Sequence, residues 1–266
     1  MLIMKVNFRI MFVFALVFML SFSAPVSADV KSLDDLKTAK VGIEVNSVAE
    51  AVAYDVLKDF KTEFVKYDSV GELVGGLISG EVEAIILDEN PARFFALDTA
   101  QLKILEQPLL SENYGIAFKK DDPLRAQVNK ALQEIKNDGT LEKIITKYVG
   151  GEPTPDEIDF NRNPDNKKLW VGCAASFPPY DMRSDDGFFG IDIELCAAIA
   201  KKLGMELVIA DYRFDLLFEA LAAGKVDMLC SGLTINEERS KNFDFSEPYE
   251  SDQIVVMIFE KNEAQK

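Results

Sequence analysis

The sequence predicts an α/β protein of two lobes, each built on a mainly parallel sheet flanked by helices. Short apolar segments of strand length alternate with amphipathic segments of helix length, which is the pattern of βαβ units. This alternation stops at residues 150–168 and then starts again. The chain has 266 residues, a length at which one hydrophobic core tends to divide into two.

Before the interruption, the pattern predicts a regular series of elements that follows a helix beginning at Ser32. We expect strands at residues 40–45, 63–67, 82–87 and 102–105, and helices at residues 48–60, 70–78 and 91–97. A strand at 114–118 and helices at 123–136 and 140–148 complete this half, and Asp138-Gly139 separates the last two helices.

Residues 150–168 are expected to form a surface linker, because they combine two glycines and three prolines with several Asp and Asn residues. After them the alternation predicts strands at 169–174, 206–210, 226–230 and 254–259, and helices at 191–203 and 214–223. The segments 73–88 and 217–231 are similar: each has an amphipathic helix, a Gly-containing turn and an apolar strand. We therefore expect two lobes of similar architecture.

Residues 1–28 have the layout of a cleavable secretory signal. Lys5 and Arg9 precede an apolar run at 10–22, and the small residues of Val26-Ser27-Ala28 follow it. The alternative, a membrane anchor, needs about 20 apolar residues, more than this run provides. We expect cleavage near Ala28 and a soluble protein in the periplasm.

Composition excludes several classes of function. The formal net charge of −16 argues against binding to nucleic acid or to anionic membranes, both of which need basic patches. The chain has no histidine, which excludes Ser-His-Asp and Cys-His catalysis and every His-ligated metal site. We expect neither a metal nor a cofactor.

The three cysteines, Cys173, Cys196 and Cys230, lack the CxxC spacing of a zinc site or redox pair. Cys173 and Cys230 each end a predicted strand, so a disulfide between them is one interpretation in an oxidising compartment. Three buried thiols are the other interpretation, and we favour it slightly.

Ligands of open α/β sheets bind beyond the carboxyl ends of the strands, and two such places carry suitable side chains. Ser231-Gly232-Leu233-Thr234 follows one strand, and Arg239 stands near the start of the next helix, a combination that could bind an anion. Asp88 follows strand 82–87 and suits an ammonium group. The alternatives are a plain helix cap with a surface arginine, and an N-cap aspartate for a helix that begins at Pro91.

Long segments of the chain resemble the amino-acid-binding proteins of ABC importers, of the glutamine, histidine and lysine-arginine-ornithine type in solute-binding family 3. Residues 168–249 carry VGCAASFPPYD, GFFGIDIELCAAIAKKLG and LFEALAAGKVDMLCSGLTINEERSKNFDFSEPY. Residues 32–149 resemble the remainder of the same family through SLDDLKTAKVGIEV, VEAIILDENPARF, YGIAFKKDDPLRAQVNKAL and DGTLEKIITKYVGG. The resemblance implies the type II periplasmic binding protein fold.

In that family the two segments occur in the opposite order, so the resemblance implies a circular permutation. Lobe A would comprise residues 30–110 plus 253–262, and lobe B residues 114–250, with the linker 150–168 inside lobe B. The hinges would lie near residues 110–114 and 249–253. A linker of this length, at about 3.3 Å per extended residue, can join surface termini that usually lie close together.

The resemblance also implies roles for single residues. Arg239 matches the arginine that pairs with the ligand carboxylate, with Thr234 and the backbone of Gly232 beside it. Asp88 matches the carboxylate that receives the ligand ammonium. Because Arg239 and Asp88 come from opposite lobes, a ligand that binds both would stabilise the closed form.

Phe177 and Phe214 match the two aromatic positions that enclose the ligand side chain, and Ser47 matches a small polar carboxylate contact. Two features depart from the family pattern. Ala174 stands where relatives that bind basic or amide side chains often have Asp, and Asn46-Ser47-Val48 replaces a turn richer in glycine and threonine. Glu44 could supply a negative group if it faces the cleft; the alternative is a solvated glutamate at the end of a strand.

The expected function is that of a monomeric, non-catalytic receptor that delivers an amino acid to an ABC permease in the inner membrane. An enzyme resembling cyclohexadienyl dehydratase is one alternative, with Asp88 or Glu89 as the acid. A ligand sensor for a membrane receptor kinase is another. The sequence does not identify the side chain of the ligand.

Overall fold

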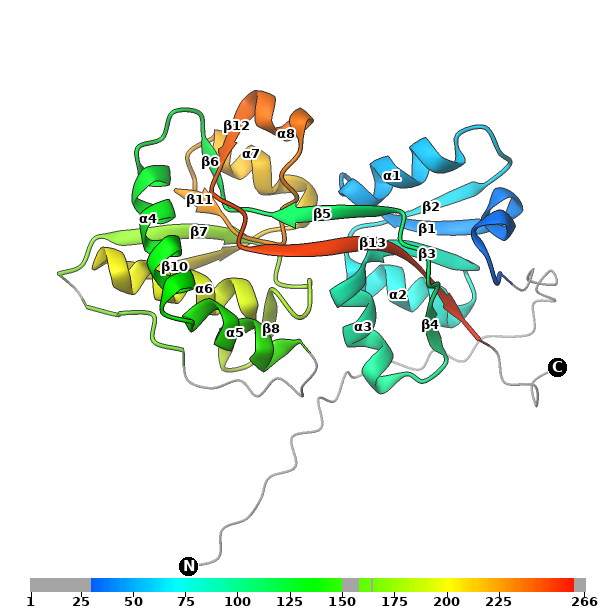
Figure 1. The fold of residues 1–266 in the computed structure, drawn as a ribbon, viewed down its shortest axis with the longest axis horizontal. Helices are drawn as coiled ribbons and strands as arrows, with labels where there is room; N and C mark the ends of the chain where they lie inside the picture. Colours follow the sequence, from blue (N-terminus) through cyan, green and yellow to red (C-terminus); the bar gives the residue numbers. More distant parts are fainter. Residues whose placement is uncertain (1–29, 150–157, 164, 261–266) are drawn as a thin grey trace, which may run out of the picture.

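The computed structural model describes residues 30–149, 158–163 and 165–260. The expected secretory signal at 1–28 lies outside the described residues, as do residues 150–157 and 164 of the expected linker. The described chain forms two lobes, each with its own sheet (Figure 1). Among the described residues, no helix is both long enough and apolar enough to cross a membrane.

The sheet of the first lobe has the strand order β2-β1-β3-β13-β4, and β5 also pairs with β13. Strands β2, β1 and β3 are mutually parallel, and β13 joins them in the antiparallel direction. The strands are β1 (Lys40–Glu44), β2 (Glu63–Tyr67), β3 (Ala84–Asp88), β4 (Leu102–Ile104), β5 (Leu110–Tyr114) and β13 (Glu250–Phe259).

Helices cover both faces of this sheet, which explains the continuous apolar run in β3. Ala84 and Ile86 pack in the cluster that includes the buried side of α1, whereas Ile85 and Leu87 pack with α2. Figure 1 shows α1 on one side of the sheet and α2 and α3 on the other. The helices are η1 (Leu33–Thr38), α1 (Val48–Leu57), α2 (Val70–Ser79) and α3 (Glu89–Asp98).

The sheet of the second lobe has the order β10-β7-β11-β6-β12. Strands β10, β7 and β11 are parallel, and β6 and β12 are antiparallel additions. The strands are β6 (Ala117–Lys119), β7 (Lys168–Cys173), β10 (Glu206–Asp211), β11 (Met228–Leu229) and β12 (Phe243–Phe245). A separate hairpin consists of β8 (Met182–Ser184) and β9 (Gly187–Phe189).

Helices also flank the second sheet. Val171 of β7 packs in the cluster with α4, α5 and α6, whereas Leu229 of β11 packs with α7 in a separate cluster. The helices are α4 (Leu124–Asn137), α5 (Thr140–Tyr148), α6 (Ile191–Leu203), η2 (Phe214–Leu216), α7 (Leu217–Ala222) and α8 (Glu237–Asn242). The predicted fold class is therefore confirmed, with antiparallel strands added to a parallel centre in both sheets.

Strands β5 and β13 run side by side between the lobes (Figure 1). Their register pairs Tyr114 with Glu250 and Leu110 with Ile254. Three buried tyrosines fill the space at this crossing: the ring of Tyr114 lies 5.2 Å from that of Tyr180 and 6.4 Å from that of Tyr249. The two lobes therefore touch through a packed aromatic centre next to their connecting strands.

The bounds of several elements differ from the sequence prediction, in two cases because residues far apart in the sequence pair with each other. The predicted strand at 114–118 is divided between β5 and β6, because the N–H of Gly115 donates to Leu233 O at 2.9 Å instead of continuing one ladder. The predicted helix at 214–223 begins as the 3₁₀ turn η2. The last strand starts at Glu250 because it pairs with β5.

All three cysteines are buried and free. Cys173 ends β7 and Cys230 directly follows the neighbouring strand β11, yet they form no disulfide. The favoured interpretation of three buried thiols is the one that the structure bears out.

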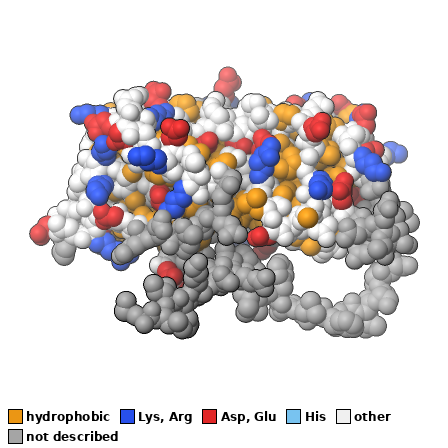
Figure 2. All heavy atoms as spheres, turned by 60° about the horizontal axis from the view of Figure 1, so that its bottom comes forward, with side chains coloured by type: hydrophobic (Ala, Val, Ile, Leu, Met, Phe, Trp, Pro, Cys, Tyr) orange, Lys and Arg blue, Asp and Glu red, His pale blue; other side chains and the backbone are white. Residues whose placement is uncertain are grey.

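One face of the molecule is drawn in Figure 2, where acidic and basic side chains are interspersed over the described residues. A protein that binds nucleic acid needs a continuous basic surface. The mixed charges on this face do not provide one.

Candidate functional site

Asp88 ends β3 and stands directly before α3, which begins at Glu89 rather than at Pro91. Asp88 occupies the N-cap position of α3, as the alternative interpretation expected, but its side chain makes no capping hydrogen bond. The carboxylate instead accepts a short hydrogen bond from the hydroxyl of Tyr114 in β5. The register between β3 and β13 places Asp88 opposite Ile254, next to the strands that connect the lobes.

Glu112 of β5 is a second carboxyl group, next to Asp88, and it is buried, with 4% of its surface exposed. Its Oε2 accepts a hydrogen bond of 2.5 Å from Thr234 Oγ1, and its Oε1 is buried without a hydrogen-bond partner. Burial, followed by the negative charge of Asp88 and a hydrogen bond to it, raises the pKa of Glu112 to about 10. Burial also raises the pKa of Asp88. Two carboxyl groups in contact cannot both ionise cheaply, so the pair holds a proton at neutral pH.

Asp252 of β13 is a third carboxyl group in this cluster. Tyr114 lies between Asp252 and Asp88, and its hydroxyl oxygen is 3.2 Å from Asp252 Oδ2. The backbone N–H of Asn90 donates to the same oxygen at 3.3 Å. Burial and the charge of Asp88 raise the pKa of Asp252 to about 7. Neither Glu112 nor Asp252 was predicted from the sequence as a site residue.

Arg239 lies in α8 and belongs to the second lobe. Asn236 caps this helix by accepting from the backbone N–H of Arg239 at 2.8 Å. The arginine side chain takes no part in the cap. The guanidinium donates to the carbonyl of Thr234 at 3.1 Å and lies over the rings of Phe218 and Phe214, at 5.1 and 5.9 Å. Arg239 is therefore partly buried and held against the second lobe, rather than being a freely solvated surface arginine.

The charge of Arg239 has no counterion in the described part of the chain, where no carboxylate lies within 4.0 Å of it. Burial lowers the pKa of Arg239, and the nearby charges of Glu112 and Asp88 raise it in part. A partly buried guanidinium that already has one carbonyl acceptor can use its remaining donors for an anion.

Gly232 allows the loop before Arg239 to pack against Phe177. Its φ of +52° is rare for other residues, and a Cβ at this position would lie 2.3 Å from Phe177 Cε1. The Gly232 N–H donates to the buried Asp192 at 2.7 Å, so this amide is already used within the protein. Phe177 stacks on Tyr180 with a centroid distance of 5.4 Å.

Ser47 caps α1: its Oγ accepts from the N–H of Glu50 at 3.0 Å and donates to the carbonyl of Glu44 at 2.8 Å. Ala174 is buried beside Phe214 in an apolar cluster, where it supplies no charge to the site.

Glu44, at the carboxyl end of β1, is only 7% exposed, so the interpretation of a solvated strand-end glutamate is wrong. Burial, followed by the charges of Asp88 and Asp215, raises the pKa of Glu44 to about 8. The backbone N–H of Val70 opposes this increase. Glu44 thus adds a buried acidic group near Asp88, and it interacts with Asp215 of the second lobe.

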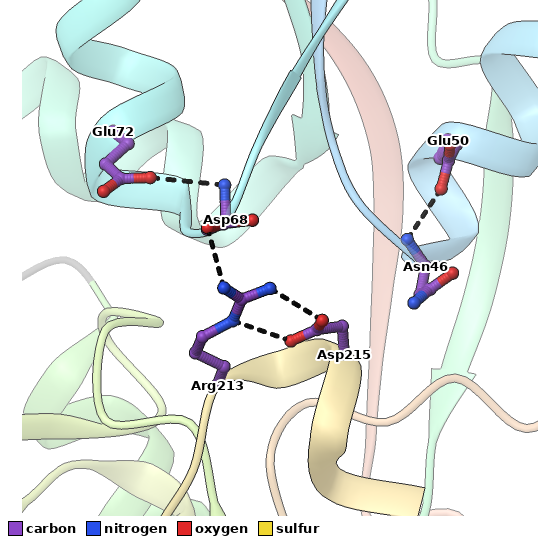
Figure 3. A network of polar contacts seen from close by, with 6 residues as sticks. All are labelled: Asn46, Glu50, Asp68, Glu72, Arg213 and Asp215. Carbon is purple, nitrogen blue, oxygen red and sulfur yellow. Dashed lines mark hydrogen bonds and ion pairs between the residues drawn. The ribbon is translucent and has the colours of Figure 1, made fainter.

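An ion pair joins the lobes near the same place. Arg213 donates to Asp68 of the first lobe at 2.9 Å and to Asp215 at 2.7 and 3.0 Å (Figure 3). In the described part of the chain, Arg213 is the one cation that pairs with Asp68. The backbone N–H of Asp68 donates to Glu72 at 3.2 Å. Asn90 and Tyr180 form another contact between the lobes, at 2.7 Å. The lobes are therefore connected by at least two side-chain contacts besides β5 and β13.

A pocket of about 360 Å³ opens beside the connecting strands. Its lining includes Glu112, Asp252, Glu89 and Glu250. Burial raises the pKa of Glu250 to about 7, whereas Glu89 is paired with Arg93. No group of acidic or cysteine side chains in the described residues could hold a metal ion.

The structure thus brings several of the expected residues into one continuous set. Arg239, Thr234 and Phe214 lie together, and Glu112 connects Thr234 to Asp88. Phe177 lies behind the Gly232 loop that leads to them.

These features define a solute-binding protein, and comparison with known proteins agrees. The chain belongs to the bacterial extracellular solute-binding proteins, family 3, whose sequence profile matches residues 31–151 and 169–265. The profile covers both lobes, and it is interrupted only by the expected linker.

Curated relatives match shorter parts of the chain. The arginine-binding extracellular protein ArtP of Bacillus subtilis is 41% identical over 83 residues, which is 31% of this chain and 32% of ArtP. A probable histidine-binding protein of Campylobacter jejuni is 34% identical over 96 residues, 36% of this chain and 38% of the relative. The L-cystine-binding protein TcyJ of Escherichia coli K12 is 31% identical over 109 residues, 41% of each chain. The chain thus spans about a third to two fifths of the length of these relatives.

Among solved structures, an ancestral arginine-binding protein bound to glutamine is 45% identical over a part that covers 31% of this chain and 37% of that one, with a TM-score of 0.31.

Proposed function

We propose that the protein is a receptor that captures one free amino acid between its lobes, with Arg239 binding the carboxylate and Asp88 the ammonium group. One observation carries this proposal: a partly buried guanidinium and a partly buried carboxylate come from different lobes, and neither has an ion-pair partner in the described part of the chain. A zwitterion supplies the missing charge at both ends. Thr234 lies between these two groups and can contact the ligand as well.

Ligand binding would favour the closed arrangement of the lobes, because only this arrangement brings both charged groups to one molecule. Strands β5 and β13 would serve as the hinges, near residues 110–114 and 249–253. Phe177 and Phe214 would enclose the ligand side chain, and Ser47 would contribute at the N-terminus of α1. The binding role needs no catalytic residue and no cofactor.

A basic side chain on the ligand has support from Glu44, whose buried carboxylate has no cationic partner among the described residues. Ala174 supplies no acidic group on the opposite side, so Glu44 would take that role from the first lobe. The names of the relatives, which include arginine-binding and histidine-binding proteins, agree with such a ligand.

The proposed biological role is delivery of the amino acid to an ABC permease by a monomer in the periplasm. A sensor for a membrane receptor kinase would use the same site. Capture of the purified protein by its permease, and not by a receptor kinase, supports delivery.

We also propose that the chain is a circular permutation of the family, with lobe A at residues 30–110 plus 253–262 and lobe B at 114–250. The separate matches at 31–151 and 169–265 support this arrangement. So does the sheet of the first lobe, in which β13 from the far end of the sequence completes a sheet begun by β1. A reordered gene that restores the family order should yield the same ligand affinity.

Titration calorimetry against the twenty amino acids tests the receptor function. One amino acid should bind with a stoichiometry of one, and Asp88→Asn should weaken its binding at least tenfold, because a buried charge pair is worth about 2–5 kcal/mol. Absence of binding by all twenty would refute the proposal.

A dehydratase is the second candidate, because a protonated carboxyl group in a cleft can act as a general acid. The raised pKa values of Asp88 and Glu112 favour it. Glu89 is less suitable, since it is already paired with Arg93. Incubation of the protein with prephenate and with arogenate, followed by detection of the aromatic product, decides between the two functions.

A further inference from the structure

Glu112 is a buried acidic residue beside the proposed ligand contacts Arg239 and Asp88, and the proposed function gives it no role. It lies on β5, one of the two strands between the lobes, and 4% of its surface is exposed. Thr234 Oγ1 occupies its Oε2 at 2.5 Å, but its Oε1 is buried without a hydrogen-bond partner while the residue lines the 360 Å³ pocket. No donor among the described residues reaches this oxygen, so it is available to a donor that a ligand brings.

The surroundings of Glu112 define what can occupy that oxygen. Asp88 at the end of β3 and Asp252 on β13 are its acidic neighbours. Tyr114, two residues along β5, donates to Asp88, and the register of β5 and β13 places Asp252 opposite Glu112. The cation that faces the pair is Arg239 of α8, which interacts with both Glu112 and Asp88. Tyr114 on β5 already donates its only hydroxyl proton to Asp88. In the absence of a ligand, two neighbouring carboxyl groups repel each other when both are ionised. We therefore expect Glu112 and Asp88 to share one proton.

We propose that the ammonium group of the ligand takes the place of this proton, so that Glu112 is a second ammonium ligand beside Asp88 and binding releases one proton. The inference rests on the proposed receptor function. An ammonium group has three N–H donors in a compact arrangement and can bind two adjacent carboxylates at once. A positive charge between the two groups removes the reason for either to stay protonated.

The hydrogen bonds around Glu112 also connect both ends of the clamp. Arg239 donates to the carbonyl of Thr234 at 3.1 Å, and the hydroxyl of Thr234 donates to Glu112 at 2.5 Å. Thr234 follows a strand of the second lobe, whereas Glu112 contacts Asp88 of the first lobe. The ammonium group therefore meets a carboxylate on the hinge strand itself, which links its binding to the relative position of the lobes.

The sign of the pH dependence follows from the release of a proton. Glu112 is protonated in the free protein below its pKa of about 10, and it is ionised in the complex. Lowering the proton concentration favours the complex, so the affinity should rise about tenfold for each pH unit between pH 6 and pH 8. Asp252 and Glu250, both with a pKa of about 7, and Glu44, with a pKa of about 8, also titrate in this range and require separate controls.

The test is calorimetry at pH 7 in phosphate and in Tris, two buffers with different ionisation enthalpies, with L-arginine, L-histidine, L-glutamine and L-cystine as probes. The difference in binding enthalpy between the buffers gives the number of protons released. We expect about one proton for the wild type and close to none for Glu112→Gln, whose amide can still accept from Thr234 and donate to Asp88. Glu250→Gln, in the same pocket, is the matched control and should still release one proton.

The outcomes separate this inference from the function on which it rests. Binding without proton release by the wild type overturns the inference and leaves the receptor function intact; this measurement needs no variant. The inference is equally overturned if Glu112→Gln releases the same number of protons as the wild type, or if Asp252→Asn alone abolishes the release. If none of the twenty amino acids binds, the receptor function fails, and the inference fails with it.

Discussion

Replacement of Arg239 by methionine removes the guanidinium and keeps a flexible apolar side chain against the rings of Phe214 and Phe218. In the wild type the guanidinium lies 5.9 and 5.1 Å from these rings and has no carboxylate within 4.0 Å in the described part of the chain. The ligand carboxylate would therefore be its counterion, and the closed lobes would bury this pair. Loss of one partner of such a buried pair costs about 2–5 kcal/mol, which corresponds to a 30-fold to several-thousand-fold weaker affinity.

The same geometry predicts a different result for stability without ligand. A partly buried guanidinium without a counterion gains little from its charge, so Arg239→Met should not lower the melting temperature of the ligand-free protein. The increase in melting temperature that saturating ligand produces should become much smaller, because that increase depends on the ratio of ligand concentration to Kd. Arg239→Lys keeps the charge but loses the planar fork, and it should bind with intermediate affinity.

Titration calorimetry and thermal unfolding of the three proteins check both results, with the exposed Arg162→Met as the control for a lost surface charge. An affinity of Arg239→Met within threefold of the wild type would show that the ligand carboxylate binds elsewhere. A lower melting temperature of ligand-free Arg239→Met would mean that the guanidinium stabilises the fold itself.

Three further substitutions test other parts of the site. Arg213→Ala removes the 2.9 Å ion pair with Asp68 and should weaken ligand binding by no more than about fivefold, because exposed pairs contribute about 0.2–1 kcal/mol; a loss that persists in 1 M salt would contradict this reason. Glu44→Gln should weaken the binding of L-arginine at least tenfold, on the order of a buried charge pair, while L-glutamine binds as before; equal losses for both would exclude Glu44 as a contact for a basic side chain. Gly232→Ala places a Cβ 2.3 Å from Phe177 at a backbone φ of +52°. This clash and strain should lower the free energy of unfolding by about 1–3 kcal/mol, and an unchanged urea midpoint would show that the loop adapts.

The sequence predicted the regular elements well wherever the signal is local. Residues 63–67, 140–148 and 191–203 form a strand and two helices with the predicted bounds. Their apolar spacing and their bounding residues lie within the segments themselves. Strand β13 was predicted four residues too short, because its first residues are polar and are held by pairing with β5, more than a hundred residues away.

The candidate site was predicted in part for a similar reason. Arg239 and Asp88 follow strands in positions where ligands bind, and the resemblance to the family gave each a role. Glu112 and Asp252 carried no such signal, since each is one acidic residue in a polar segment. A strand that places a carboxyl group two residues before a buried tyrosine could have suggested Glu112, although only burial distinguishes it from a solvated glutamate.

The sequence by itself determined the α/β class, the two lobes and the two charged residues proposed to bind the ligand, because periodicity, strand ends and family motifs are properties of short segments. The tertiary structure decided which of those residues are buried and which lie together. It showed that the Asp88 side chain, at the N-cap position of α3, accepts from Tyr114 instead of capping the helix, and that the Arg239 guanidinium is partly buried against two phenylalanine rings. It also placed Glu112 against Asp88. The physical reason is that desolvation and charge proximity, which set the protonation of these groups, arise only when distant segments pack against each other.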